Sequence, residues 1–198
     1  KPLVLYHEFE RFQYTQVLSV LFLVASWFFL PLLLWLMAVG IFSLFGLGLY
    51  MVELSYYDPW YRDSLELHKS LGVVLLLVLF FRLVWRWSNT SPEISGSLAE
   101  KKMAHVGHKA LYAIMLVLMI TGYLISTADG RAISVFGLVD LPAISFSFEN
   151  QEDTAGEIHW LLAWGLILMA ALHALAALKH HFINKDGTLN KMLRPKPE

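Results

Sequence analysis

The feature that most constrains this chain is an uninterrupted apolar run over residues 157–181, with histidines near its start, middle and end. Within it, His159 and His173 are separated by fourteen positions. Fourteen α-helical residues return a side chain to within about 40° of its first direction and advance it by about 21 Å. The run is therefore predicted to be a membrane-spanning helix with two imidazoles on one face, one near each edge of a hydrocarbon core about 30 Å thick.

Ionisable side chains are rare inside membranes because insertion of a charged one costs at least about 2.5 kcal/mol. A single histidine there can be satisfied by a backbone carbonyl and needs no function. Two imidazoles on one face, separated by the small residues Ala163 and Ala170, favour a site for two flat cofactors stacked across a membrane.

The composition is that of a membrane protein, because 57% of the 198 residues are hydrophobic and only 16% are charged. The absence of cysteine excludes disulfides, thiolate ligands, iron–sulfur clusters and covalently attached c-type haem. Any haem must be held non-covalently by His or Met. No nucleic-acid-binding signature and no phosphate loop are present, so we expect no nucleic-acid partner.

The apolar stretches predict an all-α membrane protein, a four-helix transmembrane bundle with an additional apolar N-terminal segment. The expected spans cover about residues 32–53, 68–87, 101–126 and 157–181. Pro31 divides the first stretch, because proline kinks or ends a helix. Residues 17–30 lack an A-x-A cleavage site, so a signal peptide is not favoured. The expected domains are an atypical leader (1–31), a haem-binding transmembrane domain (32–183) and a basic tail (184–198).

Lysine and arginine near the span ends predict the orientation, since they are enriched on the cytoplasmic side. They gather between the second and third spans (Arg82, Arg86, Lys101, Lys102, Lys109) and in the tail (Lys179, Lys185, Lys191, Arg194, Lys196). The other two loops are rich in Asp and Glu. Both termini are therefore expected to be cytoplasmic. The apolar piece at residues 132–139 of the longest loop is expected to lie in the membrane interface.

Histidines from two spans are expected to meet. His68 opens the second span and His159 the fourth. Both spans run inward, so the two imidazoles lie at one depth and suit a b-haem. His173 lies about 21 Å deeper and needs a partner near the start of the first span. Arg82 shares the face of His68 and either pairs with a haem propionate, which suits a guanidinium fork, or anchors the span at the inner surface.

The motifs LSYYDPWY, LHKSLG, HVGHKALY, TGYLISTADG and LHALAALKHHFINKDGTLNKM resemble the bacterial di-haem cytochrome b561 family over about residues 35–195. The resemblance implies an inner-membrane bundle that binds two b haems and passes electrons between the periplasmic face and quinone. At least one branch of the family oxidises superoxide and reduces ubiquinone. By motif, His68 and His159 resemble the outer-haem ligands, His173 the span-four ligand of the inner haem, and His180 a residue near the quinone site.

One position departs from the family. Leu34 stands where the family has a histidine before Trp-Leu, and leucine cannot ligate iron. Three outcomes stay open: the inner haem is absent, it is five-coordinate on His173, or another histidine replaces the ligand. His108 is the nearest candidate, with a structural or capping role as its simpler alternative. His105 and then His7 follow.

The expected function is a multi-pass b-type cytochrome of the bacterial inner membrane, with one or two haems b. It would pass electrons from superoxide, or another periplasmic donor, to a ubiquinone-like quinone, which would make it a superoxide:quinone oxidoreductase. The alternatives are a membrane-anchor subunit for a periplasmic oxidoreductase and a haem-depleted structural bundle. Two basic clusters have two interpretations each. Arg62, Lys69 and Arg131 either attract superoxide or pair with loop acids, and Lys179, His180 and His181 either serve a quinone or form an interfacial cluster.

Overall fold

Four long helices make up most of the chain that the computed structural model describes, namely residues 16, 31–89, 94, 96–144 and 149–186. They are a first helix over Pro31–Val52, α2 (Tyr61–Ser88), α3 (Leu98–Ser126) and α4 (Gln151–Lys179), which continues into the π-helical turn η1 (His180–Asn184). This confirms the predicted helical fold. The predicted leader and most of the predicted tail lie outside the described residues.

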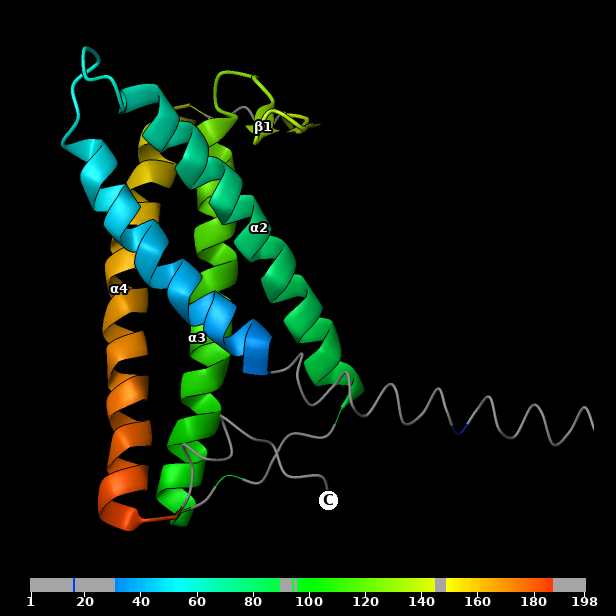
Figure 1. Cartoon of the computed structure of the whole chain (residues 1–198), viewed down its shortest axis with the longest axis vertical. Helices are drawn as coiled ribbons and strands as arrows, with labels where there is room; N and C mark the ends of the chain where they lie inside the picture. Colours follow the sequence, from blue (N-terminus) through cyan, green and yellow to red (C-terminus); the bar gives the residue numbers. More distant parts are fainter. Residues whose placement is uncertain (1–15, 17–30, 90–93, 95, 145–148, 187–198) are drawn as a thin grey trace, which may run out of the picture.

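The helices α3 and α4 lie side by side along their length, and the first helix crosses them obliquely (Figure 1). Helix α2 leans away from both as it descends in this view. The upper end carries the turn between the first helix and α2 together with two short strands, β1 (Ile133–Val135) and β2 (Val139–Leu141). We call it the hairpin end. The opposite end, where α3 begins and α4 finishes, is the tail end.

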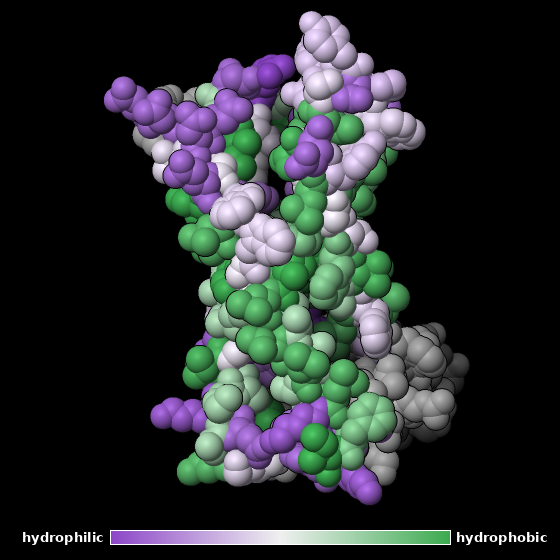
Figure 2. Space-filling view, turned by 90° about the vertical axis from the view of Figure 1, so that its left-hand side faces the viewer, coloured by the Kyte–Doolittle hydropathy of each residue, from purple (hydrophilic) through white to green (hydrophobic). Residues whose placement is uncertain are grey.

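The surface between these ends is apolar. Each of the four helices contains an 18-residue window with a mean hydropathy of 2.0 to 2.3 and at most two charged residues. In Figure 2 a hydrophobic band separates two hydrophilic ends. Exposed leucine and phenylalanine side chains are costly in water but favourable in lipid, where helices satisfy their own backbone groups. The chain is therefore a multi-pass membrane protein with four candidate spans.

The buried centre is small and contains side chains from all four helices. Leu79 and Leu166 are almost fully buried, and Met37, Leu75 and Met115 pack with them. This arrangement leaves the two ends of the bundle for polar and ring side chains, which is where the histidines lie.

Helices α2, α3 and α4 all begin earlier than the sequence predicted, α3 at Leu98 rather than about residue 101. Helix α2 starts at Tyr61 rather than residue 68, and α4 starts at Gln151 rather than residue 157. Apolar runs mark the part of a helix that lies in hydrocarbon, whereas the backbone stays helical through the polar turns that precede it. His68 and His159 therefore lie about two turns inside their helices, where neighbouring helices hold their rings.

The loop between α3 and α4 also differs from the prediction. The sequence indicated only an apolar interfacial piece at residues 132–139, whereas the structure forms an antiparallel hairpin with positive φ at Phe136 (53°) and Gly137 (69°). Ser70 of α2 fastens it, because its Oγ accepts the Phe136 N–H at 2.9 Å and donates to the Ser134 carbonyl at 3.5 Å. The hairpin is thus tied to α2 two residues beyond His68.

Candidate cofactor-binding site

The first histidine pair joins α2 to α4. The rings of His68 and His159 have centroids 6.3 Å apart and planes inclined at 67°. An imidazole nitrogen binds a metal at about 2.0–2.1 Å, so two imidazoles that share one metal from opposite sides have ring centres on the order of 6 Å apart. The spacing of this pair therefore fits one metal ion between the rings.

One turn of α3 holds the ring of His159. Its Nδ1 lies 3.0 Å from the Leu118 carbonyl oxygen and 3.2 Å from Thr121 Oγ1. A carbonyl oxygen can only accept, so Nδ1 carries the hydrogen and donates it, and Nε2 keeps its lone pair for a ligand. Gly122 lies against the same ring, since a Cβ there would approach His159 Cε1 to 3.1 Å.

The ring of His68 has a different environment. It lies against Gly48 of the first helix, where a Cβ would be 3.4 Å from its Cε1. Its Nδ1 is buried and has no hydrogen-bond partner within the described part of the chain. Glycines on two different helices thus make room for the two rings of the first pair.

The second pair joins α3 to α4. The rings of His108 and His173 have centroids 5.1 Å apart and planes inclined at 66°. Ser97 caps α3 through a reciprocal capping box with Glu100, so the capping role considered for His108 is wrong. His108 instead lies opposite His173, and its Nδ1 is buried without a partner among the described residues. Leu34 is half-buried on the first helix.

Two arginines of α2 surround a tyrosine of α3 near this pair. Arg82 donates from Nε to Tyr112 Oη at 2.9 Å, and the Arg86 guanidinium lies 5.5 Å from the centre of the same ring. Arg82 Nη1 is buried without a partner in the described part of the chain. This leaves one N–H group available to an anionic group such as a carboxylate.

The buried atoms without partners support a bound group at these positions. Buried polar side-chain atoms are nearly always hydrogen-bonded in proteins. Of the described residues, those with a buried, unpartnered side-chain nitrogen are His68, Arg82, His108 and His181. The part of the chain that the structure describes contains no cluster of three or more His, Cys, Asp or Glu side chains that would hold a bare metal ion. Two facing imidazoles without further protein ligands fit a metal whose other ligands come from a flat organic ring, as in haem.

His180 lies in a polar cluster at the tail end. Its Nδ1 is 2.6 Å from the carboxylate of Asp186, which the π-helical turn and the left-handed Lys185 (φ 52°) bring back toward it. Nearby, Lys179 of α4 pairs with Glu100 of α3 at 2.7 Å. Sequence reasoning identified His180 but missed Asp186.

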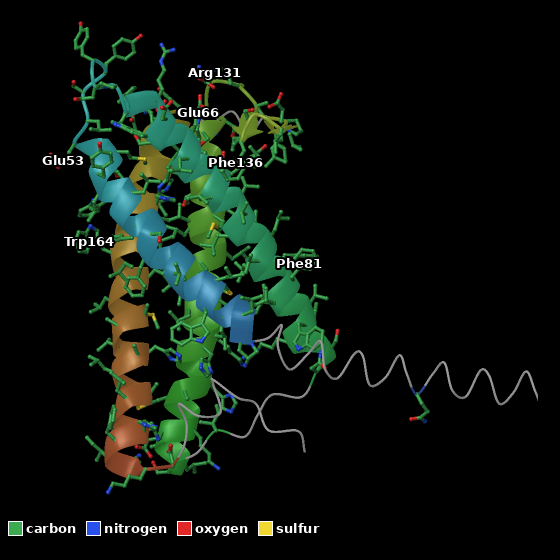
Figure 3. The ribbon with its side chains drawn as sticks, in the orientation of Figure 1. Glu53, Glu66, Phe81, Arg131, Phe136 and Trp164 are labelled. Atoms are coloured by element: carbon green, nitrogen blue, oxygen red, sulfur yellow. The ribbon has the colours of Figure 1, made fainter. Side chains whose placement is uncertain are left out.

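The hairpin end is predominantly acidic. Figure 3 shows Glu53, Glu66 and Arg131 there, whereas Phe81 and Trp164 lie along the spans. Arg131 pairs with Asp129, and hydrogen bonding from the arginine lowers the pKa of the Asp129 carboxyl. For Arg131 the structure thus shows the predicted pairing with a loop acid. Arg62 instead donates to the Tyr56 hydroxyl at 3.2 Å.

Comparison with known proteins agrees with this geometry. The model of the prokaryotic cytochrome b561 family matches residues 28–195. The chain belongs to this family. It is 47% identical to cytochrome b561 homolog 2 of Escherichia coli K12 over 161 residues, which cover 80% of this chain and 86% of that protein. It is 34% identical to the probable superoxide oxidase CybB of Yersinia pestis over 142 residues, which cover 71% and 78%.

Membership identifies the protein as a cytochrome b561-family membrane electron carrier and implies a b-type haem. Some residues around the rings had no signal in the sequence. Thr121, the Leu118 carbonyl and Gly48 lie on helices other than those of the histidines they contact. A periodic pattern in one helix does not show which turn of another helix faces it.

Proposed function

We propose that this cytochrome carries electrons across the membrane from a donor at the hairpin end to a quinone at the tail end. His68 and His159 would hold one haem b, and His173 with His108 a second. A bound haem supplies reversible one-electron chemistry. The chain would supply the ligand nitrogens, the apolar shell and access from each end.

The observation that carries this proposal is the arrangement of two facing imidazole pairs along one helix. His159 and His173 lie on α4, about 21 Å apart along its axis, and each faces a histidine of another helix. A buried electron carrier needs successive sites across the apolar region, and the pairs occupy such positions. Arg82 would then neutralise a propionate of the second haem through its unpartnered N–H group.

The orientation follows from the charges. Arg82, Arg86 and Lys179 lie toward the tail end, whereas carboxylates dominate the hairpin end, so we place the tail end in the cytoplasm of a bacterium. His180 would lie beside the quinone, with its Nδ1 held by Asp186 and Nε2 left to exchange a proton or hydrogen bond. Superoxide is the donor favoured by the resemblance to the CybB relative.

A haem-to-protein ratio by pyridine haemochrome is the first test, with wild type, Leu34→His and His108→Leu side by side. Two haems in wild type and one in His108→Leu would support both pairs. One haem in wild type that rises to two in Leu34→His would show that Leu34 has emptied the second site. The absence of any Soret band after haem-replete expression would make the chain a structural bundle and refute the proposal.

A second candidate function is supported by the charges of the hairpin end. Described acids there include Glu53, Asp58, Asp63, Glu66, Asp129, Asp140, Glu149, Glu152, Asp153 and Glu157, against Arg62, Lys69 and Arg131. Such an excess repels superoxide and fits a basic periplasmic oxidoreductase for which this chain would be the membrane anchor.

The two donors are separated by mixing the purified haem protein with a superoxide source and ubiquinone analogue. Fast haem reduction that superoxide dismutase abolishes identifies superoxide as the donor. Without such reduction, salt-sensitive co-purification of a basic periplasmic oxidoreductase identifies the anchor function.

A further inference from the structure

We infer that one turn of α3 sets the tautomer and the basicity of His159, with Thr121 as a positioning residue. We call this turn the ring seat; it consists of the Leu118 carbonyl, the Thr121 hydroxyl and Gly122. The inference rests on the proposed ligand role of His159. It concerns residues of α3, which contribute no ligand to the first pair.

The contacts come from three positions on one side of α3. Thr121 Oγ1 donates to the Leu118 carbonyl at 2.9 Å, and His159 Nδ1 lies 3.2 Å from that hydroxyl and 3.0 Å from that carbonyl. Because the hydroxyl hydrogen is used on Leu118, the hydroxyl oxygen accepts from His159. The Nδ1–H is thus shared between two acceptors of one turn.

These hydrogen bonds hold the ring of His159 firmly because they are buried. Thr121 is 5% exposed and lies in a membrane-spanning helix, where hydrogen bonds are not exchanged with water. Gly122 lets the ring approach the backbone closely, since a Cβ at this position would come within 3.1 Å of Cε1. The ring therefore has little freedom to turn away from its acceptors.

The chemistry follows from the donor role of Nδ1. An imidazole that donates strongly from one nitrogen places more electron density on the other, which makes it a better ligand for an oxidised metal. The Thr121 acceptor should therefore lower the reduction potential at the first pair. His68 has no comparable partner on its Nδ1 within the described chain, so the effect acts through His159.

Three variants of the full-length haem protein test this inference. Thr121→Val removes the hydroxyl with little change of shape, whereas Thr121→Ser keeps it. Thr127→Val is the matched control, because Thr127 caps the end of α3, is buried like Thr121, and donates its hydroxyl to the Tyr123 carbonyl at 2.8 Å. Each variant is titrated electrochemically and its low-spin electron paramagnetic resonance signal is recorded.

We expect Thr121→Val to raise the reduction potential of the first-pair component, so that its ratio of reduced to oxidised haem at a fixed potential increases about two- to fivefold. Thr121→Ser and Thr127→Val should match wild type. Equal potentials and spectra in all variants would overturn the inference. If Thr121→Val does not accumulate, Thr121→Ala makes the same comparison.

The variant His159→Leu separates this inference from the proposed function. It identifies the first-pair component as the one that disappears from the titration. If His159→Leu retains every haem, the proposed ligand role has failed. If it loses one haem while Thr121→Val behaves like Thr127→Val, only the ring seat has failed.

Discussion

The two histidine pairs have nearly the same ring inclination, 67° and 66°, but different spacing, 6.3 Å in the first pair and 5.1 Å in the second. The first pair joins α2 to α4. The second joins α3 to α4, which lie side by side along their length (Figure 1). Rings on two closely packed helices meet directly, whereas rings on more separated helices leave width for a flat group between them.

The residues around the first pair also leave more room for a bound group than those around the second pair. The first pair has glycines against both rings and two acceptors on His159. The second pair has no glycine against its rings in the described chain, and Gly107, beside His108, has open space around it. The spacing and the glycines therefore fit a flat group between the rings of the first pair, whereas the rings of the second pair would have to move apart to accept one.

The largest expected effect is the loss of the first site. If His68 and His159 hold a haem, His68→Leu removes one of its two ligand nitrogens from a buried position, so we expect the haem-to-protein ratio to fall by one. Pyridine haemochrome and the low-spin spectrum measure it. His105→Leu is the control because His105 is exposed. An unchanged haem-to-protein ratio in His68→Leu would exclude the first pair as a haem site.

The second site should be the weaker of the two. We expect it to fill last when haem supply is limited and to lose its haem first in mild denaturant, because α3 and α4 must separate around it. Titration of the apoprotein with haemin, followed in the Soret band, measures both affinities. Equal affinities would show that the shorter distance between the rings of the second pair does not weaken haem binding.

A double variant tests whether His108 is a ligand of the second site. If His108 has replaced the ligand missing at Leu34, then Leu34→His should restore the second haem to His108→Leu. A His108→Leu protein that binds as much haem as wild type would instead exclude His108 as a ligand.

Gly122→Ala should produce an intermediate effect. The new Cβ would lie 3.1 Å from His159 Cε1, so the ring would have to shift away from the hydrogen bonds that Leu118 and Thr121 accept from it. We expect several-fold weaker haem retention at the first site. Gly107→Ala, also on α3 but in open space, should keep its haem and gain up to about 1 kcal/mol of helix stability. Equal retention in both would show that the ring seat tolerates displacement.

The smallest expected effect is at the tail end. Lys179→Met breaks the 2.7 Å ion pair with Glu100 that joins α3 and α4. The side chains are 49% and 29% exposed, so the unfolding temperature should fall only slightly, because exposed ion pairs contribute little to stability. Thermal unfolding in detergent measures it, with Lys109→Met as a control. A large fall in the unfolding temperature would mean that this ion pair holds the two helices together.

The sequence by itself determined the four apolar helices and the family, because hydropathy and motifs belong to single segments of the chain. Helical periodicity also predicted that His159 and His173 lie on one face of α4. The direction in which each span crosses the membrane predicted that His68 lies at the same depth as His159. The structure brings His68 and His159 together.

Only the tertiary structure decided which groups from other helices meet these rings. His108 faces His173 rather than capping its helix, Thr121 and the Leu118 carbonyl hold His159, and Ser70 fastens the hairpin beside α2. These contacts depend on how each helix is rotated and where it crosses its neighbours. Packing between side chains distant in sequence sets that rotation, so the periodicity of a single helix does not contain it.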